Sequence, residues 1–210
     1  CHLKIQEAFY FDCNMRFPCR QVERETYSYL PDENFVTIDD PEVVFDAANV
    51  LRHNDDLLYL VSDSGNKQGA KWLQKQFPDK KVHVLDNIYS GVHIDSTITM
   101  LNESTVALNA NRITADKLPK LFHDYDILWI TENHIQPNGF YKYPYASKWM
   151  ALNMFSIDRK TVMVDRDQHT IIRKLEKRNF TVIPQKLTHS RTLGGGFHCC
   201  TLDLWREDGN

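Results

Sequence analysis

The segment LGGGFHC, residues 193–199, is where the sequence points most directly to chemistry. Three consecutive glycines cost backbone entropy in a helix or strand and supply no side chain to bury. They suit a place where the backbone lies against a ligand or a neighbouring strand, and here they lead to Cys199. A thiolate attacks electron-poor carbon well, so Cys199 is a candidate nucleophile. A glycine-rich bend before a buried cysteine would explain the same pattern without chemistry.

Two further segments place ionisable side chains among apolar residues. Asp46 lies in FDAANV and is either a turn cap or a buried functional acid. His93 and Asp95 lie in VHIDST, where positions i and i+2 of a strand would face the same side. The imidazole and the carboxylate would then share one space, either as a functional pair or as an ordinary hydrogen-bonded surface pair.

The elements that must position these residues repeat along the chain. Each repeat has a short apolar strand, a polar residue suited to cap a helix, an amphipathic helix and a closing strand. The first strands are predicted at 57–61, 105–108 and 161–164, a period of about 50 residues. The apolar helical stripes fall within 70–77, 118–122 and 171–175, and the closing strands within 82–85, 127–130 and 180–183. The expected caps are Ser64 or Asn66, Thr114 and Asp167.

An additional strand is predicted before each repeat, at 49–52, 94–100 and 150–155. Each unit is therefore strand, strand, helix, strand. A period of this size favours units packed around a common axis. The alternation of helices and strands is equally compatible with an ordinary parallel α/β sheet.

Composition narrows the class of protein. A chain of 210 residues with 42% hydrophobic and 25% charged residues is typical of one globular domain with a real core. The net charge of -3 provides no basic field, so nucleic acid is not an expected partner. No run of 18 apolar residues predicts a membrane span. The chain begins with Cys1 and shows no signal peptide, which suggests a fragment or a processed form.

The cysteines do not resemble a disulfide framework. They lie at positions 1, 13, 19, 199 and 200, an odd number with one adjacent pair. Reduced, intracellular thiols are the better interpretation. Cys13 and Cys19 lack two further ligands at a suitable spacing for zinc, so no structural metal is expected.

The stretch THSRT followed by LGGGFHC resembles the active-site strand of the arginine amidinotransferases. That family includes glycine amidinotransferase and the inosamine-phosphate amidinotransferases. The resemblance covers roughly residues 34–206, with FDAAN, HID and LGGGFHC in the family's order. The stretches FDAANVLR and VSDSGN are more similar to the inosamine-phosphate type.

The resemblance implies the pentein fold, an α/β propeller of ββαβ units around a central active site. The chain holds about three such units plus a terminal strand from Leu193 onward, and is therefore expected to form a partial propeller. Residues 1–40 are expected to be a diverged or truncated N-terminal segment. Residues 41–210 would be the catalytic amidinotransferase region of a single domain.

The resemblance implies catalytic roles for three residues. Cys199 would be the nucleophile, His93 the catalytic histidine, and Asp46 the acid that binds the guanidinium group. A free thiol has a pKa of about 8.5, so only a few per cent is ionised at neutral pH. A bound guanidinium or a His93 cation nearby would raise that fraction.

Three other residues would contact substrate. Asp95 resembles a substrate-binding acid, and Arg112 in LNANR falls where the family places an arginine that holds the substrate carboxylate. Ser147 in ASKW resembles a serine of the substrate site. No metal and no cofactor are expected.

The implied reaction moves the amidino group of L-arginine to an acceptor amine, glycine or an amino-cyclitol. It would pass through an amidino-cysteine intermediate and release L-ornithine. The alternatives are a deiminase-like hydrolase, which passes the group to water, and an inactive truncated remnant. The expected partners are small molecules, without nucleic acid or membrane, and a homodimer is left open. The expected location is the cytoplasm, or the mitochondrion in a eukaryote.

Overall fold

The computed structural model describes residues 10–11, 35–36, 38–136, 147–187 and 194–201. The chain divides into two compact units, which in the described residues run up to His93 and from Ile94 onward. Most of the predicted N-terminal segment, and the sequence THSRT, lie outside the described residues, and the predicted boundary near residue 40 stays a prediction.

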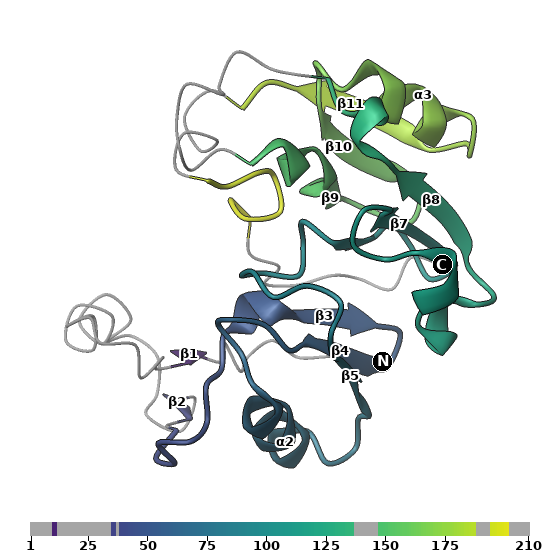
Figure 1. The fold of residues 1–210 in the computed structure, drawn as a ribbon. Coiled ribbons are helices and arrows are strands. Elements are labelled where there is room, and N and C mark those ends of the chain that lie inside the picture. Colours follow the sequence, from purple (N-terminus) through teal and green to yellow (C-terminus); the bar gives the residue numbers. More distant parts are fainter. Residues whose placement is uncertain (1–9, 12–34, 37, 137–146, 188–193, 202–210) are drawn as a thin grey trace. The chain divides into compact units, whose positions relative to one another are not determined.

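The first unit is built on a three-stranded sheet in the order β3-β4-β5 (Figure 1). Strand β3 (Val50–His53) is antiparallel to β4 (Asp56–Leu60), and β4 is parallel to β5 (Val82–Leu85). Helix α2 (Lys67–Gln76) connects β4 to β5. A short 3₁₀ helix, η2 (Ala47–Asn49), precedes β3, and β1 (Tyr10–Phe11) pairs in parallel with β2 (Phe35–Val36).

The central strand β4 carries the core of this unit. Its residues Leu58, Tyr59 and Leu60 are fully buried. A strand between two neighbours can bury both faces, which explains its continuous apolar run. Ala70 and Leu73 of α2 belong to the same core cluster as Tyr59.

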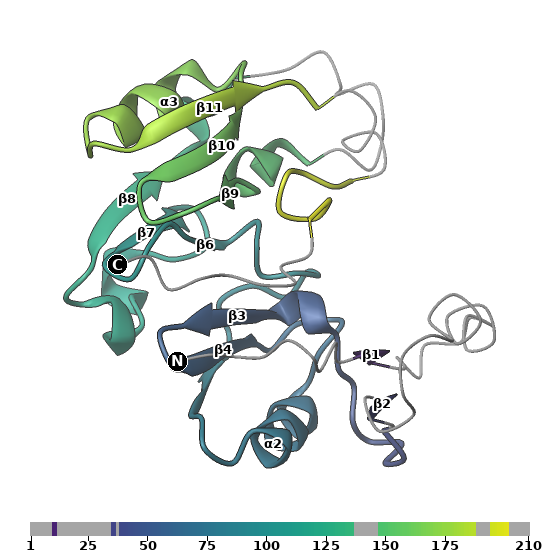
Figure 2. The ribbon, with the colours of Figure 1, turned by 180° about the vertical axis from the view of Figure 1, so that it is seen from behind.

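The second unit contains two three-stranded sheets (Figure 2). In the first, β7 (Thr105–Asn109) lies between antiparallel β6 (Ile98–Met100) and parallel β8 (Asp126–Ile130). In the second, β10 (Thr161–Asp165) lies between antiparallel β9 (Phe155–Ser156) and parallel β11 (Thr181–Gln185). Helix α3 (His169–Glu176) connects β10 to β11.

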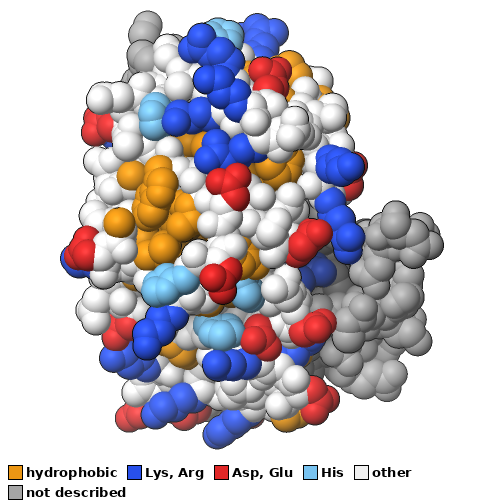
Figure 3. All heavy atoms as spheres, turned by 90° about the vertical axis from the view of Figure 1, so that its right-hand side faces the viewer, with side chains coloured by type: hydrophobic (Ala, Val, Ile, Leu, Met, Phe, Trp, Pro, Cys, Tyr) orange, Lys and Arg blue, Asp and Glu red, His pale blue; other side chains and the backbone are white. Residues whose placement is uncertain are grey.

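Both sheets of the second unit share one hydrophobic core. Ala107 and Leu128 of one sheet belong to the same cluster as Val162 and Val164 of the other. Ile171 and Leu175 of α3 complete this cluster and are fully buried. Lys and Arg side chains gather on the solvent side over α3, at the top of the view in Figure 3. The last turn of α3 contains the basic residues Arg173 and Lys174, and its buried residues are Ile171 and Leu175.

The predicted pattern of strand, strand, helix, strand is confirmed for the repeats that contain α2 and α3, with strand ends shifted by one or two residues except for the strand predicted at 150–155. The helix predicted within 118–122 is wrong. Two short 3₁₀ helices, η3 (Ala115–Lys117) and η4 (Lys120–Phe122), replace it. Pro119 lies between them and lacks an N–H, and Leu118 before it is extended. Phe122 is still fully buried, as its place in the apolar stripe predicted.

Three predicted strands differ from the structure. Residues 94–97 form a turn in which Thr97 N and Ile98 N both donate to Ile94 O, so the strand begins only at Ile98. The segment before β9 is the 3₁₀ helix η7 (Lys148–Leu152), which leaves a two-residue strand. The terminal strand is absent from the described residues 194–201, which form turns, while Leu193 itself lies outside them.

The predicted caps are only partly right. Asn66 caps α2, and Ser64 does not. Thr114 precedes η3 without a side-chain capping bond. The residue before α3 is Gln168 rather than Asp167, and it makes no side-chain capping bond. Within the described residues, no helix combines the length and the apolar character needed to cross a membrane.

The Asn66 cap predicts a measurable loss of stability. Its Oδ1 accepts from Gly69 N at 2.8 Å and from Val44 N at 3.2 Å, and its Nδ2 donates to Glu42 O at 2.7 Å. Because Asn66→Ala removes all three bonds, we expect the free energy of unfolding to fall by about 1–2 kcal/mol. Urea denaturation measures this loss.

Lys71→Ala on the exposed face of the same helix is the control. It should change the unfolding free energy by less than about 0.5 kcal/mol. Equal effects of the two substitutions would contradict the capping role.

Candidate active site

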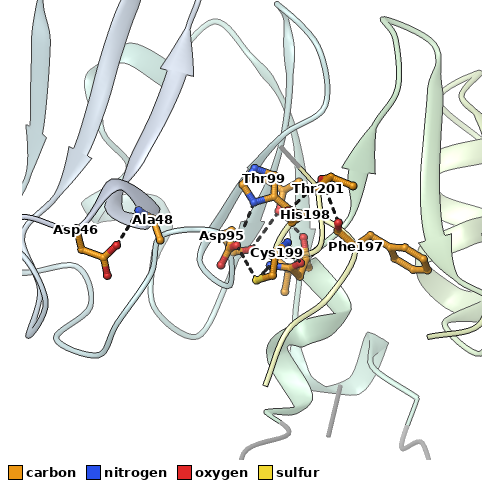
Figure 4. A network of polar contacts seen from close by, with 10 residues as sticks. Asp46, Ala48, Asp95, Thr99, Phe197, His198, Cys199 and Thr201 are labelled. Atoms are coloured by element: carbon orange, nitrogen blue, oxygen red, sulfur yellow. Dashed lines mark hydrogen bonds and ion pairs between the residues drawn. The ribbon is translucent and has the colours of Figure 1, made fainter. Parts of the chain in front are cut away.

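The buried carboxylate of Asp95 contacts the side chains of His198 and Cys199 in the second unit (Figure 4). Asp95 Oδ2 lies 3.1 Å from His198 Nδ1 and accepts a hydrogen bond from Cys199 Sγ at 3.3 Å. Only 8% of the Asp95 side chain is exposed, against 46% for His198. His198 and Cys199 are consecutive in the chain, and both side chains contact the same oxygen of Asp95. Asp95 lies about a hundred residues earlier in the sequence.

The second oxygen of this carboxylate has a different environment. Asp95 Oδ1 is buried and has no hydrogen-bond partner among the residues that the structure describes. Leaving a buried acceptor unpaired costs free energy, and such atoms are uncommon in folded proteins. Asp95 Oδ1 could therefore accept a hydrogen bond from an N–H group of a ligand.

Asn153 clamps the cysteine in place. Its Oδ1 accepts from Cys199 N at 3.0 Å, and its Nδ2 donates to Cys199 Sγ at 3.2 Å. Its backbone oxygen accepts from Phe197 N at 3.0 Å. The sequence did not identify Asn153 or His198 as site residues. The available signals were an amide within the apolar run WMALNMF and a histidine directly before Cys199.

The glycines before Cys199 have a specific packing role. A Cβ built on Gly196 would lie 2.5 Å from both Cβ and Oδ1 of Asn153. No side chain fits there, so the glycine lets the backbone lie directly on the amide that holds the cysteine. The glycine-rich segment was expected to lie against a ligand or a neighbouring strand, whereas Gly196 packs against the buried side chain of Asn153.

The electrostatic environment keeps the sulfur protonated at neutral pH. Cys199 and Cys200 are free and exposed, while Cys1, Cys13 and Cys19 lie outside the described residues. The partial burial of the sulfur, followed by the negative charge of Asp95, raises the pKa of Cys199 to about 11. Hydrogen bonds from Gly196 and Asn153 oppose this rise and do not cancel it.

Asp95 itself is held in the ionised form. Burial alone would raise its pKa, but the hydrogen bond and the charge of His198 lower it, as do the bonds from Cys199 and Asn153. The net pKa of Asp95 lies below the ordinary value for aspartate. The resting site is therefore a carboxylate beside a thiol.

Arg112 is anchored to the turn that carries Asp95. Its Nη1 donates to Ser96 O at 3.1 Å, to Ser96 Oγ at 2.8 Å and to Thr97 Oγ1 at 2.6 Å. Its guanidinium carbon lies 6.0 Å from the centre of the Trp149 ring. These contacts stabilise the turn, and the predicted binding of a substrate carboxylate stays a prediction.

Ser147 occupies the start of the 3₁₀ helix η7. Its side chain is exposed, and its Oγ accepts from Trp149 N at 3.2 Å. Ser147 therefore has a structural role as a helix cap, next to the ring that Arg112 approaches. Its predicted substrate contact stays a prediction.

Asp46 and His93 form a pair within the first unit. Asp46 Oδ1 accepts from Ala48 N at 2.9 Å at the start of η2, and Asp46 Oδ2 lies 3.2 Å from His93 Nε2. Figure 4 shows the bond between Asp46 and Ala48. Burial would raise the pKa of Asp46, but the hydrogen bond from His93 and that from Ala48 bring it below its ordinary value. Asp46 is thus both a turn cap and an ionised partner of a histidine.

The expectation that His93 and Asp95 share one face of a strand is wrong. His93 has a left-handed φ of 65°, and Asp95 lies in the turn before β6. A positive φ breaks the alternation of an extended strand, so the two side chains have different partners. His93 pairs with Asp46 in the first unit, and Asp95 pairs with His198 and Cys199 in the second. The predicted meeting of Cys199 and His93 around one ligand stays a prediction.

Metal ligation has no support in the described part of the chain. Its His, Cys, Asp and Glu side chains form no group of three that could hold a metal ion.

Comparison with known proteins finds amidinotransferases among the relatives of this chain. No family model matches the chain. Inosamine-phosphate amidinotransferase 1 of Streptomyces griseus is 46% identical over 169 residues, which cover 80% of this chain and 48% of that protein. The L-arginine:L-lysine amidinotransferase of Pseudomonas savastanoi pv. phaseolicola is 31% identical over 168 residues, 79% of this chain and 45% of that protein. The chain spans about half the length of the curated relatives it matches.

The similar solved structures include an amidinotransferase as well. The inosamine-phosphate amidinotransferase StrB1 of Streptomyces griseus superposes with a TM-score of 0.81 at 36% identity, over 96% of this chain and 65% of that one. DDAH of Pseudomonas aeruginosa has a TM-score of 0.69 at 14% identity, over 95% of this chain and 71% of that one, which shows a common fold.

The ββαβ sheets and these superpositions define an α/β protein of the pentein fold, as predicted. Within that fold, the chain is similar in sequence to amidinotransferases over about 80% of its length. The resemblance to the amidinotransferases is confirmed.

The role of Asp95 in holding the thiol protonated predicts faster modification of Cys199 when that charge is removed. The carboxylate disfavours the thiolate, so Asp95→Asn should lower the pKa of the thiol. We expect iodoacetamide to alkylate Cys199 about tenfold faster at pH 8 in this variant, because the thiolate is the nucleophile.

The measurement uses a Cys200→Ser background and mass spectrometry of the Cys199 peptide. Asp165→Asn, which removes a buried acid from β10, is the control and should leave the rate unchanged. An Asp95→Asn rate equal to or below the parent's would contradict the assignment.

Proposed function

We propose that this protein transfers the amidino group of L-arginine to an acceptor amine through a covalent intermediate on Cys199. The observation that carries the proposal is the contact of the Cys199 thiol with Asp95, whose second oxygen is buried and has no hydrogen-bond partner among the described residues. The relatives, which are amidinotransferases by name, support this chemistry for the site.

A guanidinium ion suits this arrangement because it is flat, cationic and rich in N–H donors. Carboxylates bind it through paired, charge-assisted hydrogen bonds. We infer that Asp95 Oδ1 accepts one of these bonds, and that Asp46 supplies a second acid. Such contacts would fix the plane of the cation so that the sulfur approaches its central carbon from one face.

The same cation would activate the nucleophile. The pKa of Cys199 is about 11 in the ligand-free protein, so almost no thiolate exists at neutral pH. A positive charge beside Asp95 offsets the carboxylate that raises this pKa. Each unit by which the pKa falls increases the thiolate fraction about tenfold. Binding of the substrate would thus generate the group that attacks it.

His93 is proposed as the proton carrier. Attack of the thiolate on the guanidinium carbon forms a C–S bond, and cleavage of the C–N bond releases ornithine once its nitrogen is protonated. His93 would give that proton and later remove one from the acceptor amine, which displaces the sulfur. Two half-reactions on one thiol predict ping-pong kinetics.

The names of the relatives support one class of acceptor over the other. The proteins of 46% identity are inosamine-phosphate amidinotransferases by name, which favours an amino-cyclitol over glycine as the acceptor. We propose small-molecule substrates alone as partners, and a cytoplasmic location.

Covalent transfer predicts that Cys199 carries the amidino group after exposure to the donor alone. We expect arginine labelled at the guanidino carbon to leave label on the Cys199 peptide, detected by mass spectrometry. Cys199→Ser should abolish the label, since the hydroxyl is a far weaker nucleophile, while Cys200→Ser should retain it. His93→Ala and Asp46→Ala should both reduce it. Absence of label on Cys199 at saturating arginine would contradict the proposed intermediate.

The products distinguish a transferase from a hydrolase or a remnant. With arginine and an amino-cyclitol we expect ornithine and a new guanidino compound, and Cys199→Ser should lower turnover by at least about a thousandfold. Citrulline and ammonia would instead indicate transfer to water. A chain without either product and without an arginine-induced rise in melting temperature would be the inactive remnant.

A further inference from the structure

We propose that Asn153 is a positioning residue that orients the Cys199 sulfur and supplies the N–H donor that stabilises its thiolate. The proposal deepens the proposed function and rests on it for the use of that thiolate. It concerns a residue that touches the nucleophile through both ends of its amide.

The orientation of the Asn153 amide follows from its partners. A backbone N–H can only donate, so the atom that faces Cys199 N at 3.0 Å must be the oxygen Oδ1. The nitrogen Nδ2 then faces the sulfur at 3.2 Å. One planar side chain therefore fixes both the backbone and the sulfur of the same residue.

Asn153 is itself immobilised. It is 1% exposed, and its N–H donates to Met150 O at 3.1 Å at the end of η7. Thr99 Oγ1 of β6 donates to the preceding carbonyl, Leu152 O, and lies 3.5 Å from Asp95 O. Gly196 packs against the other side of the amide. The amide is thus held between elements that also hold Asp95, which makes its geometry relative to the sulfur well defined.

Asn153 and Asp95 act on the sulfur in opposite directions. The carboxylate accepts the S–H proton and raises the pKa of the thiol, whereas the amide N–H lowers it. Once the proton has left, Asp95 Oδ2 has no proton to accept and repels the thiolate, while Nδ2 becomes a donor to a charged acceptor. Hydrogen bonds of that kind are the stronger ones. Asn153, like the backbone of Gly196, is therefore a contact that favours the reactive form.

Two substitutions at this position separate the donor from the rest of the side chain. Asn153→Asp keeps an oxygen for Cys199 N and loses the N–H donor, and Asn153→Ala loses both without adding charge. In a Cys200→Ser background, we expect both variants to alkylate Cys199 about tenfold more slowly than the parent at pH 9. This corresponds to a thiol pKa raised by about one unit.

Asn49→Asp is the matched control. Asn49 is also fully buried, and it bonds to Ser62 and Ser64 in the first unit. It should leave the alkylation profile of Cys199 unchanged. Thermal denaturation of each variant reports packing separately, because a residue with a merely structural role would change the melting temperature and not the pH profile.

The outcomes separate this proposal from the proposed function. Profiles of both Asn153 variants within about twofold of the parent would overturn the role of Asn153, even if arginine labels Cys199. Slower alkylation in both variants without any arginine label would support the role of Asn153 and contradict the transferase.

Discussion

The site depends on one buried carboxylate. Asp95 accepts a hydrogen bond from the Cys199 thiol and faces the His198 imidazole with the same oxygen. Its other oxygen has no hydrogen-bond partner in the part of the chain that the structure describes. The negative charge of Asp95 holds the thiol in the unreactive form, because a thiolate beside a carboxylate in a partly buried site is repelled. A cationic ligand would relieve this repulsion and satisfy the other carboxylate oxygen at once. These features of the resting structure support the guanidinium binding that we propose.

The fold positions this carboxylate through a short turn and its anchors. Residues 94–97 turn back on Ile94 O, and Arg112 and Asn109 both bind Ser96 O. Asn153 lies at the end of η7, and Cys199, which follows the glycine-rich segment, binds its side chain. Polar anchors of this kind fix side-chain geometry more narrowly than hydrophobic packing does, as a positioned nucleophile requires.

Much of the fold was predictable because burial imposes periodicity on the sequence. The apolar runs of β4, β7 and β10 and the helical stripes of α2 and α3 appear directly in the residue pattern. The prediction of a helix before β8 was wrong because Pro119 interrupts the segment. Proline is known to break helices, but the apolar stripe around it still suggested one. The prediction of an extended strand at His93 was wrong because this residue has a positive φ. A positive φ in a non-glycine residue leaves no clear signal in the sequence. Asp95 and Cys199 were identified through the resemblance of their motifs, whereas Asn153 and His198 emerged only from three-dimensional contacts.

The most direct test of this account is the titration of Cys199 with and without a guanidinium ligand. The thiolate is followed by its ultraviolet absorbance, as the difference between the parent chain and Cys199→Ser, in the presence and absence of methylguanidine. The account predicts a midpoint near the ligand-free pKa of about 11 that falls by at least about one unit when the cation is present. If methylguanidine left the titration midpoint of the Cys199 thiol unchanged, the proposed role of Asp95 in binding a guanidinium ion would be contradicted.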